Sequence, residues 1–160
     1  MANLCFWNGL LSKIDKDDFS FLFNKYRDLQ NESNSLHYMN KSKLSIQNFI
    51  NLLKNMNQMI KIEKEQNNSK QAKDYNDIKW QNISLSKIQL NENFDHIKNF
   101  DITKITDGYW CSTCDPFLIL ICKIFEVDIE HNYCNIKINY NNTSNSRKKL
   151  IFNSNRNHFW

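Results

Sequence analysis

The residue types best suited to covalent chemistry stand near the two ends of the sequence. Cys5 begins the apolar, helix-compatible segment 5–14, and His158 follows a late apolar segment, 150–152. The backbone dipole at a helix N-terminus stabilises a thiolate, which makes such a cysteine more nucleophilic at neutral pH. A histidine elsewhere in the chain can accept the thiol proton if the fold brings the two side chains together. Cys5 and His158 are therefore a candidate nucleophile and base, although a lone cysteine or histidine more often has a packing or structural role.

A second set of residues has the spacing of metal ligands. Cys111-x2-Cys114 is followed, after sixteen residues, by His131-x2-Cys134. Four ligands in two such pairs are typical of a structural zinc site. The segment between the pairs is strongly apolar and predicts a core helix and strand, whereas zinc modules usually have little core of their own. We therefore expect no cofactor, and keep a zinc-stabilised, non-catalytic binding module as the alternative.

The elements that must position these side chains begin with helices. Apolar residues recur at helical spacing in 15–29, for which Asp17 or Asp18 is the expected cap, and again in 43–60. Residues 30–42 are polar and predict a loop, and the polar segment 61–79 predicts a mobile loop or an exposed helix end. For 80–106 the short apolar patches fit a strand or a short helix equally well.

The C-terminal third predicts one helix and three strands. Asp115-Pro116 has the form of an N-cap followed by proline at the first helical position, and opens the helical segment FLILICKIF. Alternating patterns then indicate strands at 127–130, 135–140 and 150–152. Helices followed by a small sheet predict an α+β protein.

Composition excludes several function classes. The chain has 160 residues, which fits one domain. Its net charge is +4, with 21 basic residues interleaved among 17 acidic ones, so we expect no nucleic-acid partner. With only two glycines, the sequence has no Gly-rich phosphate loop. It also has no run of 18 apolar residues, so we expect no membrane span. Five cysteines without a secretion signal favour reduced thiols inside a cell.

The local sequences around the candidate pair resemble the two catalytic blocks of the ovarian-tumour (OTU) cysteine proteases, which are mostly deubiquitinases. CFWNGLLSKI is similar to the family's nucleophile block, in which a cysteine and aromatic residues lead into a helix. LIFNSNRNHFW is similar to its histidine block, in which a hydrophobic strand and a polar turn precede His and an aromatic residue. Between them, GYWCSTCDPFLILICKIFEVDIEHNY follows the family's order of Trp, acid, helix and strand. Residues 16–105 show no such resemblance.

The resemblance implies a papain-like OTU-type fold, with a small, mostly antiparallel sheet flanked by helices, over a single domain spanning 1–160. Residues 16–105 would be a helical, variable part, and 106–160 the helix and sheet that carry the histidine. It implies that Cys5 is the nucleophile and His158 the general base. Backbone N–H groups around Asn3 and Leu4 would form the oxyanion hole, and Trp110 and Asn157 would line the substrate groove.

The implied reaction is cleavage after the C-terminal glycine of ubiquitin or a ubiquitin-like protein, through a thioester. The implied location is the cytoplasm, or the host cytoplasm for an effector from a virus or bacterium, whose AT-rich codons would explain the many asparagines. Two positions depart from the family pattern, because Ala2 and Trp160 stand where it usually has acidic or amide side chains. Three alternatives follow: a Cys–His dyad, another polar group that orients the histidine, or an inactive relative that only binds ubiquitin.

Overall fold

The computed structural model places helices and strands from both halves of the chain around one core. It describes residues 4–26, 45–66, 78–80, 83–84, 87–142 and 146–160. For the described residues within 62–90, and for residue 142, it describes the backbone alone. The helices are α1 (Cys5–Lys13), α2 (Lys16–Lys25), α4 (Ile46–Gln66), α5 (Lys87–Lys98), the 3₁₀ helix η6 (Ile102–Asp107) and α6 (Pro116–Phe125). The strands are β1 (Ile78–Trp80), β2 (Ile83–Ser84), β3 (Asp128–Tyr133), β4 (Ile136–Asn142) and β5 (Lys149–Ser154).

The five strands form one mixed sheet in the order β2-β1-β4-β3-β5. Three of its neighbouring pairs are antiparallel, and β5 runs parallel to β3 along the edge. On β5 the residues alternate between exposed and buried, as expected for a strand with one face against the core. The expected α+β class and mostly antiparallel sheet are therefore confirmed.

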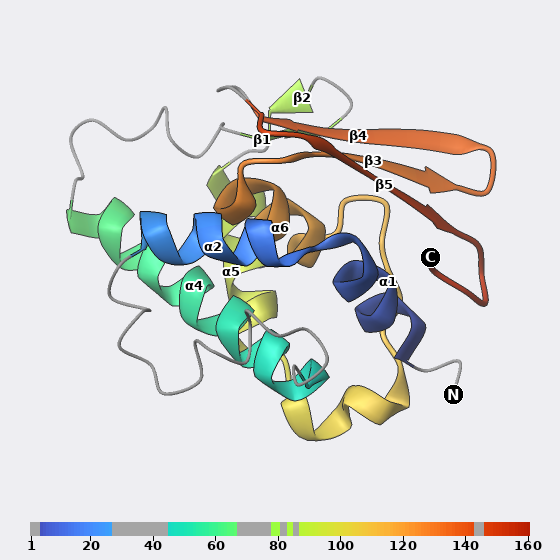
Figure 1. Cartoon of the computed structure of the whole chain (residues 1–160), viewed down its shortest axis with the longest axis horizontal. Helices are drawn as coiled ribbons and strands as arrows, with labels where there is room; N and C mark the ends of the chain where they lie inside the picture. Colours follow the sequence, from blue (N-terminus) through green and yellow to red (C-terminus); the bar gives the residue numbers. More distant parts are fainter. Residues whose placement is uncertain (1–3, 27–44, 67–77, 81–82, 85–86, 143–145) are drawn as a thin grey trace.

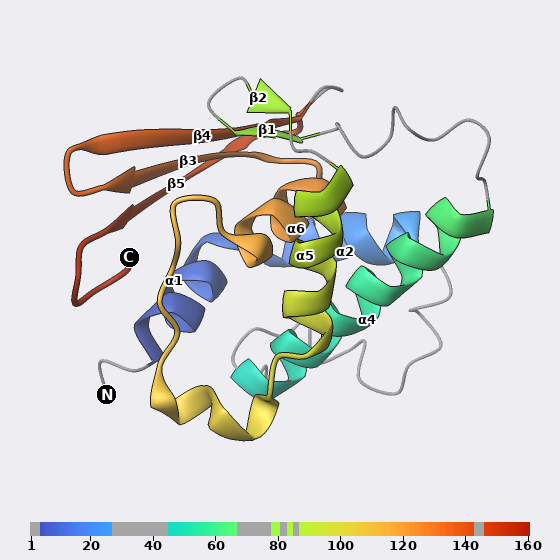
Figure 2. The same cartoon turned by 180° about the vertical axis from the view of Figure 1, so that it is seen from behind.

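The helices gather on one face of this sheet, and α6 is at their centre (Figure 1). Seen from the front, α2 crosses α6, and seen from behind, α5 crosses it (Figure 2). Eight of the ten residues of α6 are buried, because a helix surrounded by other elements must be apolar on every side. Asp115 caps this helix, since its carboxylate accepts hydrogen bonds from the backbone N–H groups of Phe117 and Leu118.

The structure confirms most of the predicted elements and corrects several details. The helix predicted at 5–14, the Asp115-Pro116 helix start and the three C-terminal strands are all present. The N-cap of α2 is Asp15, where Asp17 or Asp18 was expected, because Asp15 and Asp18 form a reciprocal capping box. That helix ends at Lys25, and α4 begins at Ile46 and continues to Gln66, beyond the predicted end at residue 60.

The structure decides between the strand and the short helix that the sequence left open for residues 80–106. Residues 87–98 form a helix, and the short strands β1 and β2 pair with each other beside β4. Strand β1 begins at Ile78, so the loop or helix end predicted for 61–79 was wrong at residues 78 and 79. The loop predicted at 30–42 and most of that at 61–79 lie outside the described residues. Among the described helices, none combines the length and apolarity needed to cross a membrane.

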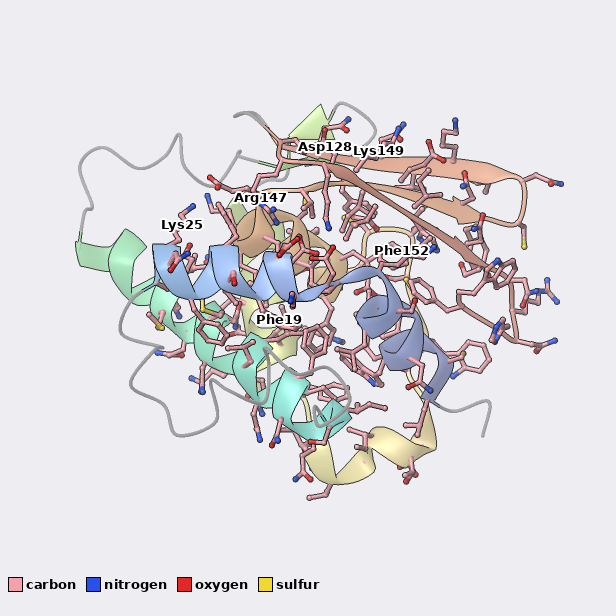
Figure 3. All side chains as sticks on the ribbon, in the orientation of Figure 1. Phe19, Lys25, Asp128, Arg147, Lys149 and Phe152 are labelled. Carbon is pink, nitrogen blue, oxygen red and sulfur yellow. The ribbon has the colours of Figure 1, made fainter. Side chains whose placement is uncertain are left out.

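One charged cluster ties the sheet to the N-terminal helices. Asp18 is 1% exposed. Its carboxylate forms salt bridges of 2.7 Å with Arg147 Nη2 and with Lys148 Nζ. Arg147 also donates from Nε to the carbonyl of Phe125, and its guanidinium lies over the ring of Phe21. Figure 3 labels Arg147 beside α2. The start of β5 is thereby fixed to both α2 and the end of α6.

Candidate functional site

Cys5 is the first residue of α1, and its side chain is partly exposed. The N-cap residue Leu4 makes no side-chain hydrogen bond to the helix. The first N–H groups of a helix have no partner within the helix, and in α1 they point out of its N-terminus. This is where a partial positive charge favours a thiolate or an oxyanion. The other expected oxyanion residue, Asn3, lies outside the described residues.

His158 is held by a short hairpin at the C-terminal end of β5, residues 153–160, called here the C-terminal hairpin. Asn155 shapes its turn, because its Oδ1 accepts from the backbone N–H groups of Asn157 at 2.8 Å and His158 at 2.9 Å. Asn153 and Trp160 then exchange two backbone hydrogen bonds of 2.8 Å. The backbone around His158 is thus fixed on both sides of the turn.

Gly9 lets α1 and the C-terminal hairpin approach each other closely. A Cβ at position 9 would lie 2.6 Å from Cδ1 of Phe159 and 3.4 Å from its carbonyl oxygen. Phe159 has little freedom to move, since it is buried against Phe6, Phe152 and His131. A glycine inside a helix costs about 1 kcal/mol relative to alanine, and here it permits the contact that sets the spacing of the two elements.

This approach places Cys5 and His158 on the walls of the same two cavities. One cavity, of about 250 Å³, also has Tyr109, Trp110 and Asn155–Phe159 on its walls, and is called here the inner cleft. The other, of about 540 Å³, is formed by α1 and residues 158–160 and is called here the outer cleft. In both views the hairpin and the loop before α6 lie beside α1 (Figures 1 and 2). The structure therefore brings the two predicted catalytic residues together.

The two predicted groove residues also lie here. Trp110, 77% exposed, and Asn157 both line the inner cleft. The loop that carries Trp110 is anchored through its neighbour, because the hydroxyl of Tyr109 donates to Asp115 at 2.8 Å. The Asp115 carboxylate is fully buried and also accepts from the backbone of Ser112, so the cap of α6 fixes one wall of the cleft.

Burial determines the protonation of Tyr109, Cys111 and Asp115 at this wall of the cleft. Loss of solvation raises the pKa of the Tyr109 hydroxyl and the Cys111 thiol, and the nearby Asp115 charge raises both further. Burial also raises the pKa of Asp115 itself, against the hydrogen bonds that favour its charged form. Cys111 therefore stays a neutral thiol, although it lines the inner cleft together with Cys5.

The alternative zinc set is not assembled. Among the described residues, which include Cys111, Cys114, His131 and Cys134, no group of three or more potential ligands surrounds a common point. His131 points into the core from β3, while Cys134 is exposed in the turn after that strand. Side chains of a strand alternate between its faces, and a turn re-aims the next one, so the spacing of His131 and Cys134 does not make them neighbours in space.

His131 instead supports the C-terminal hairpin from beneath. Its Nε2 lies 2.6 Å from the hydroxyl of Ser154, and its ring packs against Phe159 at 5.7 Å between centroids. Burial lowers the pKa of His131 to about 4, so the ring is neutral near pH 7. The backbone carbonyl of Ser154 also accepts from Cys134 at 2.9 Å, which ties the β3–β4 turn to the same hairpin.

Sequence reasoning missed three residues of the site. Gly9 carried a usable signal, because it is one of only two glycines and lies inside a helical pattern. Ser154 had none, since a serine at the end of a strand is ordinary. Trp160 was noticed only as a departure from a pattern, yet its ring stacks on His158 with 5.3 Å between centroids and 17° between planes.

No family model matches the chain, and neither the curated proteins nor the solved structures include a match.

Proposed function

We propose that this protein is a cysteine hydrolase of the OTU type, in which Cys5 is the nucleophile and His158 the general base. The observation that supports this most strongly is that Cys5 and His158, 153 positions apart, line the same two clefts. A thiol at a helix N-terminus that shares a cleft with a histidine has the two groups that nucleophilic thiol catalysis requires. Cys111 lines the inner cleft too, but it is not at a helix N-terminus, and burial raises the pKa of its thiol.

The reaction begins when His158 accepts the proton of Cys5 and the thiolate attacks a carbonyl carbon in the cleft. The N–H groups of the first turn of α1, after Leu4, are placed to stabilise the oxyanion that forms. His158 then protonates the leaving amine, and a thioester with Cys5 remains. Water attacks this thioester, with His158 as the base, and releases the carboxylate product.

The inner cleft favours an acyl group without bulky side chains. Its volume of about 250 Å³ lies below the roughly 300–1,000 Å³ of ordinary small-molecule pockets. Tyr109, Trp110 and Asn157 line this cleft together with Cys5. A cleft of this small volume suits an extended Gly-Gly tail, which supports ubiquitin or a ubiquitin-like protein as the substrate. The C-terminal carbonyl of that tail would then be attacked by Cys5.

Hydrolysis of a fluorogenic amide at the C-terminus of ubiquitin tests this proposal. We expect turnover by the wild-type chain, none by Cys5→Ala, and a loss of roughly 10²–10⁴-fold in His158→Ala, the range that general-base catalysis contributes. Cys111→Ala is the matched control, because it removes a second thiol from the same cleft and should retain turnover. Turnover that survives Cys5→Ala would contradict the assignment.

An inactive relative that binds ubiquitin remains the second candidate, because Trp160 replaces the acid that usually orients the histidine in the family. That candidate predicts ubiquitin binding by wild-type and Cys5→Ala alike, with no turnover by either. A zinc-stabilised binding module would instead contain one zinc per folded chain, which elemental analysis measures.

A further inference from the structure

The ring of Trp160 is stacked on the imidazole of His158. Their centroids are 5.3 Å apart and their planes differ by 17°, which is a parallel stack. Within the described part of the chain, no acid or amide oxygen is hydrogen-bonded to that imidazole. The side chain of Asn155 accepts from the backbone N–H of His158 but makes no hydrogen bond to its ring. The position and plane of the ring are therefore set by an aromatic face.

Trp160 is itself firmly placed. Its backbone N–H and C=O both pair with Asn153 at 2.8 Å, and the neighbouring Phe159 is buried between α1 and β5. Its side chain is 46% exposed and lines the outer cleft beside His158 and Cys5. The backbone of Trp160 is therefore fixed beside His158, and its indole stacks on the imidazole while part of it remains in water.

An aromatic face distinguishes the two protonation states of the imidazole. A cation within about 6 Å of a ring centroid is attracted by the ring quadrupole, whereas a neutral ring gains only stacking. His158 becomes a cation at the moment it accepts the proton of Cys5. The indole therefore stabilises the thiolate–imidazolium pair more than the neutral thiol and imidazole.

We propose that Trp160 is a positioning residue for His158, and that its indole, stacked on the imidazole, does the work of an orienting acid by fixing the ring plane and stabilising the imidazolium. This rests on the proposed function only in taking Cys5 and His158 as the reactive pair. Other titratable groups share the two clefts with His158, and they are Cys5, Asp107, Tyr109, Cys111, Tyr133, Arg156 and Lys13. None of these is needed for the effect of the indole.

The test is the rate at which iodoacetamide alkylates Cys5, followed by peptide mass mapping at pH 6 and pH 9. In acidic solution a thiolate forms only where a neighbouring base takes the proton, whereas in alkaline solution hydroxide removes the proton from any accessible thiol. We expect Trp160→Leu, which keeps an apolar side chain but no ring, to lose about two- to fivefold at pH 6 and little at pH 9, a factor matching an exposed cation–π contact. Trp160→Phe should restore most of the rate at pH 6.

Controls separate this inference from the proposed function. Ile151→Ala removes an exposed apolar side chain on β5, and should leave both rates unchanged. His158→Ala should remove the rate advantage at pH 6, and if it does not, the reactive pair itself is refuted. If His158→Ala has this effect while Trp160→Leu equals wild type at pH 6, or loses the same factor at both pH values, only the role of Trp160 is overturned. An equal loss in Trp160→Phe and Trp160→Leu would also overturn it.

Discussion

Gly9→Ala should slow the proposed hydrolysis by separating Cys5 from His158. The added Cβ would lie 2.6 Å from Cδ1 of Phe159, whereas carbon atoms in contact are about 3.5–4.0 Å apart, so α1 and the C-terminal hairpin must separate by about 1 Å. Phe159 cannot absorb the shift, because it is stacked on Phe152 at 5.2 Å and packed against Phe6. A displacement of this size in a catalytic pair lowers the rate by about 10²-fold.

The stability of the same variant should change much less. Alanine gains about 1 kcal/mol over glycine inside a helix, and overpacking costs about 1–3 kcal/mol, so the net loss in free energy of unfolding is about 0–2 kcal/mol. Hydrolysis of the ubiquitin amide and urea denaturation measure the two effects separately. Asn24→Ala, at an exposed helix position, is the control and should change neither. Wild-type turnover in Gly9→Ala would refute the idea that this contact sets the spacing of the site.

Two further predictions concern buried polar groups. Asp18→Asn should lower the free energy of unfolding, measured in urea, by about 2–3 kcal/mol, because it removes the carboxylate shared by Arg147 and Lys148. The control Asp17→Asn changes an exposed neighbour and should cost under about 0.5 kcal/mol. Equal losses in the two variants would contradict the role of this cluster. Burial lowers the folded-state pKa of His131 to about 4 from an unfolded value near 6.5, so its neutral form stabilises the fold above pH 6.5. That contribution is lost as the pH falls from 6.5 to 4, by at most about 1.4 kcal/mol per pH unit, and His131→Gln should flatten this part of the pH–stability curve.

The elements of the C-terminal third could be predicted from the sequence because their signals are local. Asp115 and Pro116 mark a helix start by their own chemistry, and alternation identifies strands that have one buried face. The cap of α2 was misassigned among three nearby aspartates, because all can cap and only the reciprocal bond between Asp15 and Asp18 selects one. Strands β1 and β2 are three and two residues long, too short to show a period.

The site could be predicted in part. Cys5 and His158 carried recognisable chemistry, and the structure brings them together, but what holds them depends on contacts between distant elements. The Gly9–Phe159 contact and the His158–Trp160 stack exist only after α1 and β5 have met. The four candidate zinc ligands illustrate the opposite error, because regular spacing along a chain does not establish proximity when one residue faces the core and another a turn.

The most direct test of the central claim is the mass of the chain after incubation with ubiquitin carrying a thiol-reactive C-terminal warhead. The account predicts one covalent adduct, mapped to Cys5, absent in Cys5→Ala and retained in Cys111→Ala. An adduct on another cysteine would contradict the assignment of the nucleophile. No adduct, with Cys5 still open to iodoacetamide, would contradict ubiquitin as the substrate.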